Sequence, residues 1–245
     1  MVAGVPFQQA ARIEVRIKVH PRSRNFRLSI AANLEPMLSV PARASVKDAE
    51  IFLHKQAHWL GEHLKDHPEP VPFTDGAIFP LRDRLHKISA TKKVRGLVEI
   101  VHQIEGEHLR IPLLLVPGEE KHMARRLRDW LKKQALAELE KSSDFHANRL
   151  GVKQSSINIR SQQGRWGSCS SSGKLNYNWR LILAPHFVLD YVAAHEVAHL
   201  CEMNHSKAFW DKVKQTLPDM DIGRDWLKEN GKQLLAYGIK EVGEK

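Results

Sequence analysis

His195, Glu196 and His199 form the pattern His-Glu-x-x-His in the last quarter of this 245-residue chain. On a helix, residues four apart lie on one face about one turn from each other, so the two imidazoles can bind one metal ion. Glu196 points about 100° away from His195 around the helix, which puts its carboxylate beside the metal rather than on it. From there it can take a proton from a water that the metal activates. The spacing therefore predicts hydrolysis with Glu196 as the general base.

His205 follows His199 by six residues, which is the spacing of the third ligand in His-Glu-x-x-His-x-x-Gly-x-x-His zinc proteases. Glu202 stands where those proteases have the glycine that turns the chain. Asn204 tolerates the left-handed conformation that such a turn would need. A chain with 14 histidines can produce the shorter pattern by chance, and the third histidine at a fixed spacing makes it more specific. We expect one Zn²⁺ ion, held by His195, His199 and His205.

Apolar residues around the motif predict a helix that is buried on most sides, namely Phe187, Val188, Leu189, Tyr191, Val192, Val197 and Leu200. Burying imidazoles and a carboxylate there costs free energy unless a partner compensates, and a metal ion is the simplest partner. The alternative is that His195 and His199 are hydrogen-bonded core histidines.

Three further residues near the motif leave alternatives open. Glu202 follows His195 by seven residues, which returns it to the same helix face. Its side chain could be a metal ligand, an acceptor for an imidazole N–H or a solvated group. Cys201 points away from that face, and we expect a small buried side chain. Cys169 lies in a Gly/Ser-rich turn, either as a packed thiol or as a zinc ligand. Two cysteines do not make a disulfide framework.

Period-two alternation and helical periodicity outline the elements that must position the motif. We expect strands at 13–19, 26–30, 37–40, 85–90, 97–103 and 109–115, helices at 46–66 and 119–148, and a β-hairpin over 155–183 from strands 156–160 and 175–183. A helix begins near Pro185, and two more follow at 206–216 and about 222–236. Phe209 and Trp210 are expected to pack against the motif helix.

These elements predict an α+β protein with an N-terminal β-rich region, a long basic linking helix and a small zincin-like unit of hairpin, motif helix and C-terminal helices. The predicted division is 1–116, with one helix, 117–150 and 151–245. The pattern leaves open whether 1–116 is an independent domain, and it leaves the oligomeric state open.

The chain is basic, with 38 Lys and Arg against 28 Asp and Glu and a net charge of +10. Such a charge favours association with polyanions. The segment from Lys121 to Lys133 holds six Lys or Arg residues and one Asp. These cations form either a solvated helix face or a surface that binds a polyanion. The sequence contains no run of roughly 18 apolar residues, which is the length that a membrane-spanning helix needs. The apolar stretch 2–7 is too short for a signal peptide, so we expect a soluble, cytoplasmic protein.

Three blocks of the chain resemble the YgjP-like family of zinc metallopeptidases, distant relatives of the SprT-like proteases. The blocks are Arg165-Trp166-Gly167-Ser168-Cys169 with Leu175 to Arg180, Tyr191 to His199, and Asn204-His205-Ser206 with Phe209-Trp210 and Leu217-Pro218-Asp219. A weaker resemblance extends to the N-terminal strands, through Arg22, Arg24 and Arg27, and to the Trp59 helix. The resemblance implies that His195, His199 and His205 are zinc ligands and that Glu196 is the catalytic base.

The Trp-Gly-Ser-Cys block of this family suggests a substrate-binding role for Arg160, Arg165, Trp166, Gly167 and Ser168. A strand beside the motif helix can present its edge to an extended peptide. Its backbone N–H groups, or the two arginines, can stabilise negative charge that develops on the attacked group. The alternative is that Trp166 is a core residue and the arginines are solvated charges.

The leading hypothesis is a zinc-dependent metallopeptidase that acts on a peptide or protein. One alternative is a metal-dependent phosphohydrolase acting on nucleotides, because cationic side chains favour anionic substrates. The other is a nucleic-acid-associated protein with a zinc-supported protease site. No membrane partner is expected.

Overall fold

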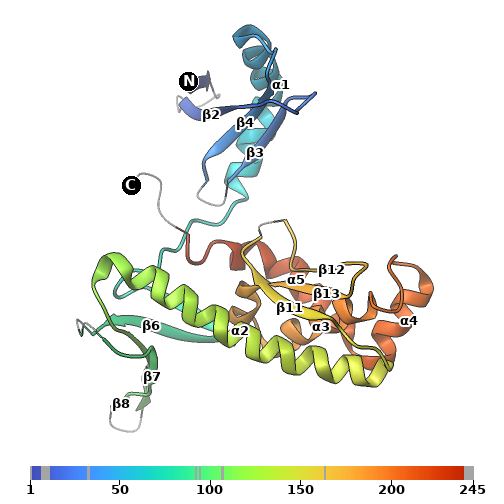
Figure 1. Ribbon diagram of the computed structural model, residues 1–245. Helices are drawn as coiled ribbons and strands as arrows, with labels where there is room; N and C mark the ends of the chain where they lie inside the picture. The colour runs from blue at the N-terminus through green and yellow to red at the C-terminus, as the bar shows by residue number, and fades with distance from the viewer. Residues whose placement is uncertain are drawn as a thin grey trace. The chain divides into compact units, whose positions relative to one another are not determined.

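The computed structural model describes residues 2–6, 12–31, 34–91, 93, 95–105, 108–162 and 164–239 (Figure 1). The chain divides into two compact units. Unit 1 takes residues 1–71 and 239–245, and unit 2 takes residues 72–238. A unit boundary therefore falls inside the predicted region 1–116, and the three-part division of the chain stays a prediction.

Unit 1 is a four-stranded sheet with one helix. The strands are β1 (Val2–Pro6), β2 (Arg12–His20), β3 (Arg27–Ile30) and β4 (Pro36–Pro41), and the helix is α1 (Val46–Lys65). The strand order is β1-β2-β4-β3, in which β2 and β4 run parallel and the outer pairs run antiparallel. The predicted strands and the predicted helix are confirmed, and β1 is an additional strand.

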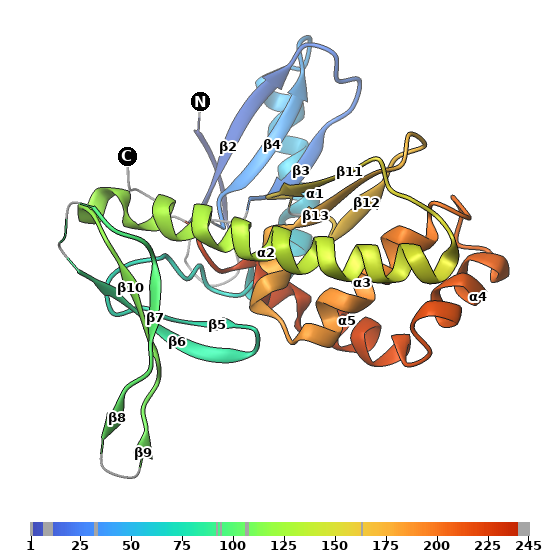
Figure 2. The same ribbon diagram turned by 60° about the horizontal axis from the view of Figure 1, so that its bottom comes forward.

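Helix α1 covers one face of this sheet (Figures 1 and 2). Ser45 caps the helix in a capping box with Asp48, which satisfies backbone N–H groups of the first turn. The core lies between the two layers, where Val15 and Leu38 from the strands meet Leu53 and Leu60 from the helix. Because side chains alternate along a strand, the residues between these core positions point to the opposite face of the sheet.

Unit 2 begins with a second four-stranded sheet, in the order β5-β6-β10-β7. Its strands are β5 (Ile78–Leu81), β6 (Arg84–Ala90), β7 (Glu99–Val101) and β10 (Leu113–Val116), and β8 (Ile104–Glu105) pairs with β9 (His108–Leu109) apart from it. The turn between β5 and β6 donates backbone hydrogen bonds from Arg82 to Ile182 and from Asp83 to Leu183. This turn therefore ties the sheet to the segment that precedes the motif helix.

Helix α2 (Glu120–Leu150) runs along unit 2 and joins its layers (Figure 2). Its buried residues recur every four positions, at Met123, Leu127, Leu131, Ala135 and Leu139, and make one apolar stripe. The helix packs against β10 and against four elements nearer the motif. These are β11 (Ser156–Arg160), the 3₁₀ helix η1 (Trp179–Leu183), α3 (His186–Ala198) and α4 (Lys207–Thr216). It ends at Gly151, whose φ of 68° is the left-handed conformation that glycine adopts at little cost. The predicted helix 119–148 is confirmed.

A three-stranded sheet follows, and it differs from the predicted hairpin. Its strands are β11 (Ser156–Arg160), β12 (Gly167–Cys169) and β13 (Lys174–Asn178), in the order β11-β13-β12. The hairpin is formed by β12 and β13, whereas β11 runs parallel to β13 on its other side. The prediction that 156–160 and 175–183 pair as a hairpin is therefore wrong. The Gly/Ser-rich interruption between them is long enough to hold a strand of its own.

The predicted strand 175–183 also ends early. Residues Trp179–Leu183 form the 3₁₀ helix η1, and all five are buried. The side chain of Asn178 accepts a hydrogen bond from the N–H of Arg180 and so caps this short helix. A continuous apolar run is compatible with either a buried strand or a buried helical turn, which is why the pattern does not distinguish them.

The last three helices are α3 (His186–Ala198), α4 (Lys207–Thr216) and α5 (Met220–Leu235), which confirms the predicted helices. Helix α3 carries the motif and packs against α2, α4, α5 and β12. The α+β class is confirmed. None of the described helices combines the length and the apolar composition that crossing a membrane would need.

Candidate metal centre

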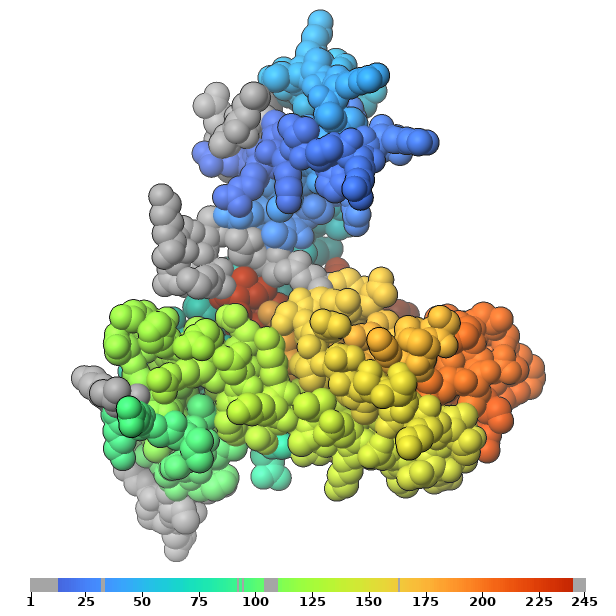
Figure 3. Space-filling view, viewed as in Figure 1, coloured from blue at the N-terminus to red at the C-terminus, as the bar shows by residue number. Residues whose placement is uncertain are grey.

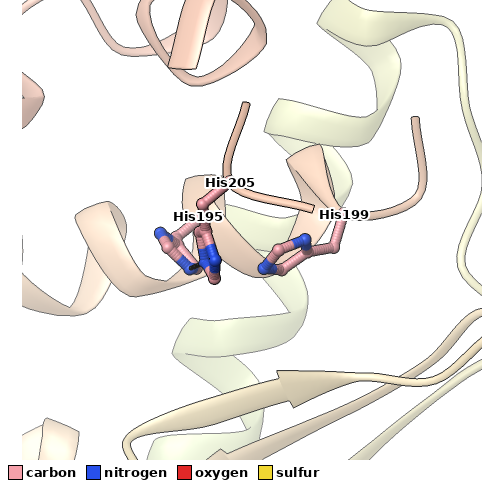
Figure 4. Close-up of side chains that lie close together, drawn as sticks. All are labelled: His195, His199 and His205. Atoms are coloured by element: carbon pink, nitrogen blue, oxygen red, sulfur yellow. Dashed lines mark hydrogen bonds between the residues drawn. The ribbon is translucent and has the colours of Figure 1, made fainter. Parts of the chain in front are cut away.

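The three histidines of the motif converge on one point (Figure 4). His195 lies on α3, His199 is the residue that caps its C-terminal end, and His205 lies in the segment before α4. One ring nitrogen from each lies within 4.8 Å of the other two. The Nε2 atoms of His195 and His205 are 3.1 Å apart. Three imidazole nitrogens at such separations can all reach one ion at zinc–nitrogen distances of about 2.0–2.1 Å.

The chain turns between His199 and His205 without a left-handed residue. The N–H of Cys201 and the N–H of Glu202 both donate to the carbonyl of Ala198, which tightens and ends α3. Asn204 is not among the described residues with a positive φ. Its side chain instead accepts a hydrogen bond from the N–H of Ser206 at 3.1 Å. The expectation of a left-handed turn at Asn204 is therefore wrong, since tight hydrogen bonds at the helix end redirect the chain.

A backbone group orients one of the imidazoles. Nδ1 of His199 lies 3.0 Å from the carbonyl oxygen of Glu202, so an Nδ1–H donates there and leaves Nε2 free for an ion. Glu202 therefore takes part through its backbone, and a role for its carboxylate stays a prediction. Burial, together with the neighbouring histidines, lowers the pKa of His195 to about 3, and burial also lowers the pKa of His199. Both shifts favour the neutral imidazole, which is the form that binds metal.

Aromatic rings form a wall beside the three imidazoles. The ring of Phe209 is fully buried and its centroid lies 4.9, 4.4 and 4.9 Å from those of His195, His199 and His205. Trp210 lies 5.7 Å from His195 and 5.9 Å from His205. The two aromatic residues pack against the motif helix as expected, and they also limit how the imidazoles can rotate.

Glu196 is buried beside the histidines, with 5% of its surface exposed. Its Oε2 has no hydrogen-bond partner in the part of the chain that the structure describes, and neither does Nδ1 of His195. Burial raises the pKa of Glu196 to about 8, against the charge of Arg165, which lowers it. A buried carboxylate oxygen with no partner next to three convergent imidazole nitrogens fits a metal ion and a polar substrate.

Strand β12 brings two of the predicted substrate-binding residues to the same pocket. Gly167 and Ser168 line it together with the three histidines and Glu196, and Cys169 and Met203 complete the lining. A Cβ atom at Gly167 would lie 2.6 Å from Cγ of Glu196 and would overlap it. Glycine at this position therefore allows the strand to approach the carboxylate closely.

The other predicted substrate-binding residues lie elsewhere. Trp166 is half-buried and packs against the core, where a Cβ at Gly231 of α5 would lie 3.3 Å from its indole ring. Arg160 is exposed, and its Nε donates to Oδ1 of Asn176 at 3.2 Å. Arg165 is exposed and close enough to Glu196 to lower its pKa. The structure thus brings Gly167 and Ser168 to the pocket, with Arg165 near it.

The two cysteines remain separate thiols. Cys169 lines the pocket, but the described cluster of potential ligands consists of the three histidines without it. Burial, with a smaller contribution from Glu196, raises the pKa of the Cys169 thiol to about 11. Met203 is a lining residue that the sequence analysis missed, because an exposed methionine in a turn carries no periodic signal.

A comparison with models of known protein families places the chain. The model of the YgjP-like family, described as a metallopeptidase domain, matches residues 24–230. The chain therefore belongs to the YgjP-like metallopeptidase family. Among solved structures, the metallopeptidase zymogen of Pyrococcus abyssi abylysin is 20% identical, and the alignment covers 37% of this chain and 93% of that chain with a TM-score of 0.34. No curated protein matches the sequence.

Proposed function

We propose that this protein is a zinc-dependent peptidase in which His195, His199 and His205 hold one Zn²⁺ ion and Glu196 is the general base. The observation that carries the proposal is the buried, partnerless Oε2 of Glu196 beside three imidazole nitrogens that lie within 4.8 Å of one another. Among the common metals, zinc suits a site of three imidazoles with an open fourth position.

When bound, the ion would polarise the scissile carbonyl and increase the acidity of the attacking water. Glu196 would take the proton from that water at a carboxylate oxygen and pass it to the leaving amine. Burial raises the pKa of Glu196 to about 8 in the chain alone, and the positive charge of a bound ion would lower that pKa and favour the ionised carboxylate that accepts a proton. The hydrogen bond from His199 to the Glu202 carbonyl would keep Nε2 directed at the ion.

Strand β12 would position the peptide. It is an edge strand of its sheet and packs against α3, so an extended peptide can pair with its outer edge next to the histidines. The backbone groups of Gly167 and Ser168 would bind the substrate main chain. Arg165 would stabilise negative charge that develops on the attacked carbonyl. We propose no substrate contact for Arg160 or Trp166, since neither side chain lines the pocket and neither acts on Glu196 as the charge of Arg165 does.

The pocket favours a peptide over a nucleotide. Among the described residues its lining holds no lysine and no arginine, although the charge of Arg165 acts on Glu196 from nearby. The lining also includes the carboxyl of Glu196. A phosphohydrolase needs cationic side chains that clamp the phosphate groups. The apolar side chain of Met203 and the edge of β12 suit a peptide instead.

The test replaces Glu196 by Gln in the full-length protein. Glu196→Gln should lower kcat on casein-derived peptides by about 100-fold or more, because general-base catalysis contributes about that much. The zinc content should stay near one ion per chain, because the three imidazoles remain. The matched control is Glu229→Gln, which changes an exposed glutamate of α5 and should leave turnover unchanged.

Nucleoside triphosphates are assayed in parallel. Unimpaired peptide hydrolysis by Glu196→Gln would reject Glu196 as the base. Hydrolysis of nucleotides but not of peptides by the zinc-loaded protein would reject the peptidase assignment.

A further inference from the structure

The sheet of unit 1 has one face that α1 does not cover. The core residues Val15, Leu38 and Leu28 point toward α1, so the residues between them point the other way. On strand β2 these include Glu14, Arg16 and Lys18, and all three are exposed. In the space-filling view, β2 and the turn that follows it lie on the surface facing the viewer (Figure 3).

Positive charge gathers at one end of this sheet. Lys18 and Arg27 flank Ser39, because both are in register with it on neighbouring strands. The turn from β2 to β3 adds Arg22 and Arg24, and the turn after β4 adds Arg43. We call these five exposed residues the cationic end.

The acidic groups near this face lie away from the cationic end or are already engaged. Glu14 is exposed on β2, four residues before Lys18. Glu35 comes before β4, at the opposite end of that strand, and lies 3.6 Å from Arg16. Asp48 is near the cationic end, but its carboxylate accepts hydrogen bonds from Ser45 in the cap of α1. No carboxylate forms an ion pair with any of the five cations in the part of the chain that the structure describes. Their charge is therefore available to an external anion.

We propose that the cationic end binds the phosphate backbone of duplex nucleic acid. Four of its five cations are arginines, whose guanidinium groups match phosphate oxygens in a two-pronged geometry. Lys18 and Arg27 lie two strands apart, or about 10 Å, which is close to the width of a DNA groove and lets them contact phosphates on both sides of it. The small side chain of Ser39 between them leaves the surface open to a broad partner.

The face favours a duplex over a single strand. Proteins that bind single strands offer aromatic rings on which bases stack. The aromatic residue nearest to these cations in the sequence, Phe26, points the other way and stacks on Phe52 of α1 with ring centroids 5.3 Å apart. Contacts to phosphate alone are expected to be independent of base sequence and strongly dependent on salt.

The test measures binding of the full-length protein to a fluorescein-labelled 20-base-pair DNA by anisotropy between 50 and 200 mM KCl. The test variant combines Lys18→Gln with Arg27→Gln. The matched control combines Lys55→Gln with Lys65→Gln, which removes the same charge from exposed positions on α1. The test variant should bind at least about tenfold more weakly at 100 mM KCl, and its slope of log K against log salt should be smaller by about 2. The control should stay within about twofold of the parent.

Four results would overturn the proposal. They are no binding of the duplex at 50 mM KCl, equal losses in the two double variants, tighter binding of the matching single strand, and equally tight binding of poly-glutamate. Equal losses would mean that net charge alone attracts the DNA. The measurement does not involve zinc or hydrolysis, so its failure would leave the proposed peptidase untouched. Thermal unfolding of both variants near the temperature of the parent establishes that neither substitution pair unfolds the protein.

Discussion

At the scale of single residues, Gly167 determines how close the edge strand comes to Glu196, the proposed general base. No side chain larger than hydrogen fits there, because a Cβ would overlap Cγ of Glu196. Gly164 lies three residues earlier, before β12 begins, and nothing lies within 4 Å of a Cβ built on it. The same Gly→Ala substitution at both positions therefore separates the effect of crowding Glu196 from the general effect of replacing a glycine.

We predict that Gly167→Ala lowers kcat by about tenfold or more, because a displacement of the base by about 1 Å is enough to lose the geometry of proton transfer. The zinc content should not change, since the three imidazoles come from other elements. Peptide hydrolysis and metal analysis of Gly167→Ala and Gly164→Ala check this. A kcat for Gly167→Ala equal to that of Gly164→Ala would contradict it.

The three imidazoles depend on Phe209 in a different way. Its ring touches all of them, whereas the sequence pattern assigns it only to the core. A residue can pack in the core and at the same time restrict the rotamers of nearby imidazoles, as Phe209 does for the three proposed metal ligands.

At the scale of elements, a buried polar network holds the motif helix against its neighbours. Asp190 of α3 accepts hydrogen bonds from Ser142 at 2.5 Å and from His146 at 3.1 Å, both on α2. The other ring nitrogen of His146 lies 2.6 Å from Oγ1 of Thr216 on α4. The network therefore joins three helices through side chains, in addition to their apolar contacts.

The pKa of Asp190 gives this network a pH dependence. Burial alone would raise that pKa, but the hydrogen bonds from His146 and Ser142 outweigh burial and hold it below its ordinary value of 3.8. A carboxyl with a lowered pKa contributes stability above its unfolded-state value, and the contribution is lost as pH falls through the folded-state value.

We predict that Asp190→Asn lowers the free energy of unfolding by about 1–3 kcal/mol at pH 7. The difference from the parent should shrink as the pH falls below 3.8. Urea unfolding at pH 7 and near pH 3 measures it, with Asp129→Asn as a control at an exposed ion pair on α2. A difference that is the same at both pH values would show that the ionised carboxylate is not what stabilises the network.

The elements show how far the sequence determines the fold and the site. The spacing of His195, Glu196 and His199 is local to one helix, so the pattern alone predicts their convergence. Gly167 reaches Glu196 only through the pairing of β12 with β13, and the parallel pairing of β11 with β13 joins segments about 18 residues apart. Such pairings depend on tertiary packing, which no local pattern encodes.

Strand β5 shows a second limit of the sequence pattern. It contains Pro80, and a proline in the sequence argues against a strand. The strand forms because β5 lies at the edge of its sheet, where proline is tolerated.

At the scale of the whole molecule, two arginines fix the end of unit 2. Arg180 of η1 is buried, its guanidinium lies 4.6 Å from the ring centroid of Trp179, and its Nε donates to the carbonyl of Tyr237 at 3.0 Å. Arg128 of α2 donates to the carbonyl of Gly238 at 3.3 Å. Burial lowers the pKa of Arg180 to about 10, which leaves it charged at neutral pH.

We predict that Arg180→Met lowers the melting temperature by about 2–10 °C, because the Tyr237 carbonyl loses a charged donor and the cation–π contact is lost. Differential scanning calorimetry measures the shift, and Arg125→Met at an exposed position of α2 should change it by less than about 2 °C. Equal melting temperatures for the two variants would show that the buried guanidinium does not anchor the chain end.

The anchoring of Tyr237 and Gly238 also has a consequence for biosynthesis. A ribosome makes Arg128 and Arg180 before the carbonyl groups that accept their hydrogen bonds. A nascent chain that has just produced His205 still lacks Phe209, helix α5 and both of those carbonyls. Its buried guanidinium has no acceptor, and its imidazoles have no aromatic wall. The proposed metal site would therefore gain its aromatic wall only once Phe209 has been made, and the chain end would be anchored only once Gly238 has followed, so both contacts form late in synthesis.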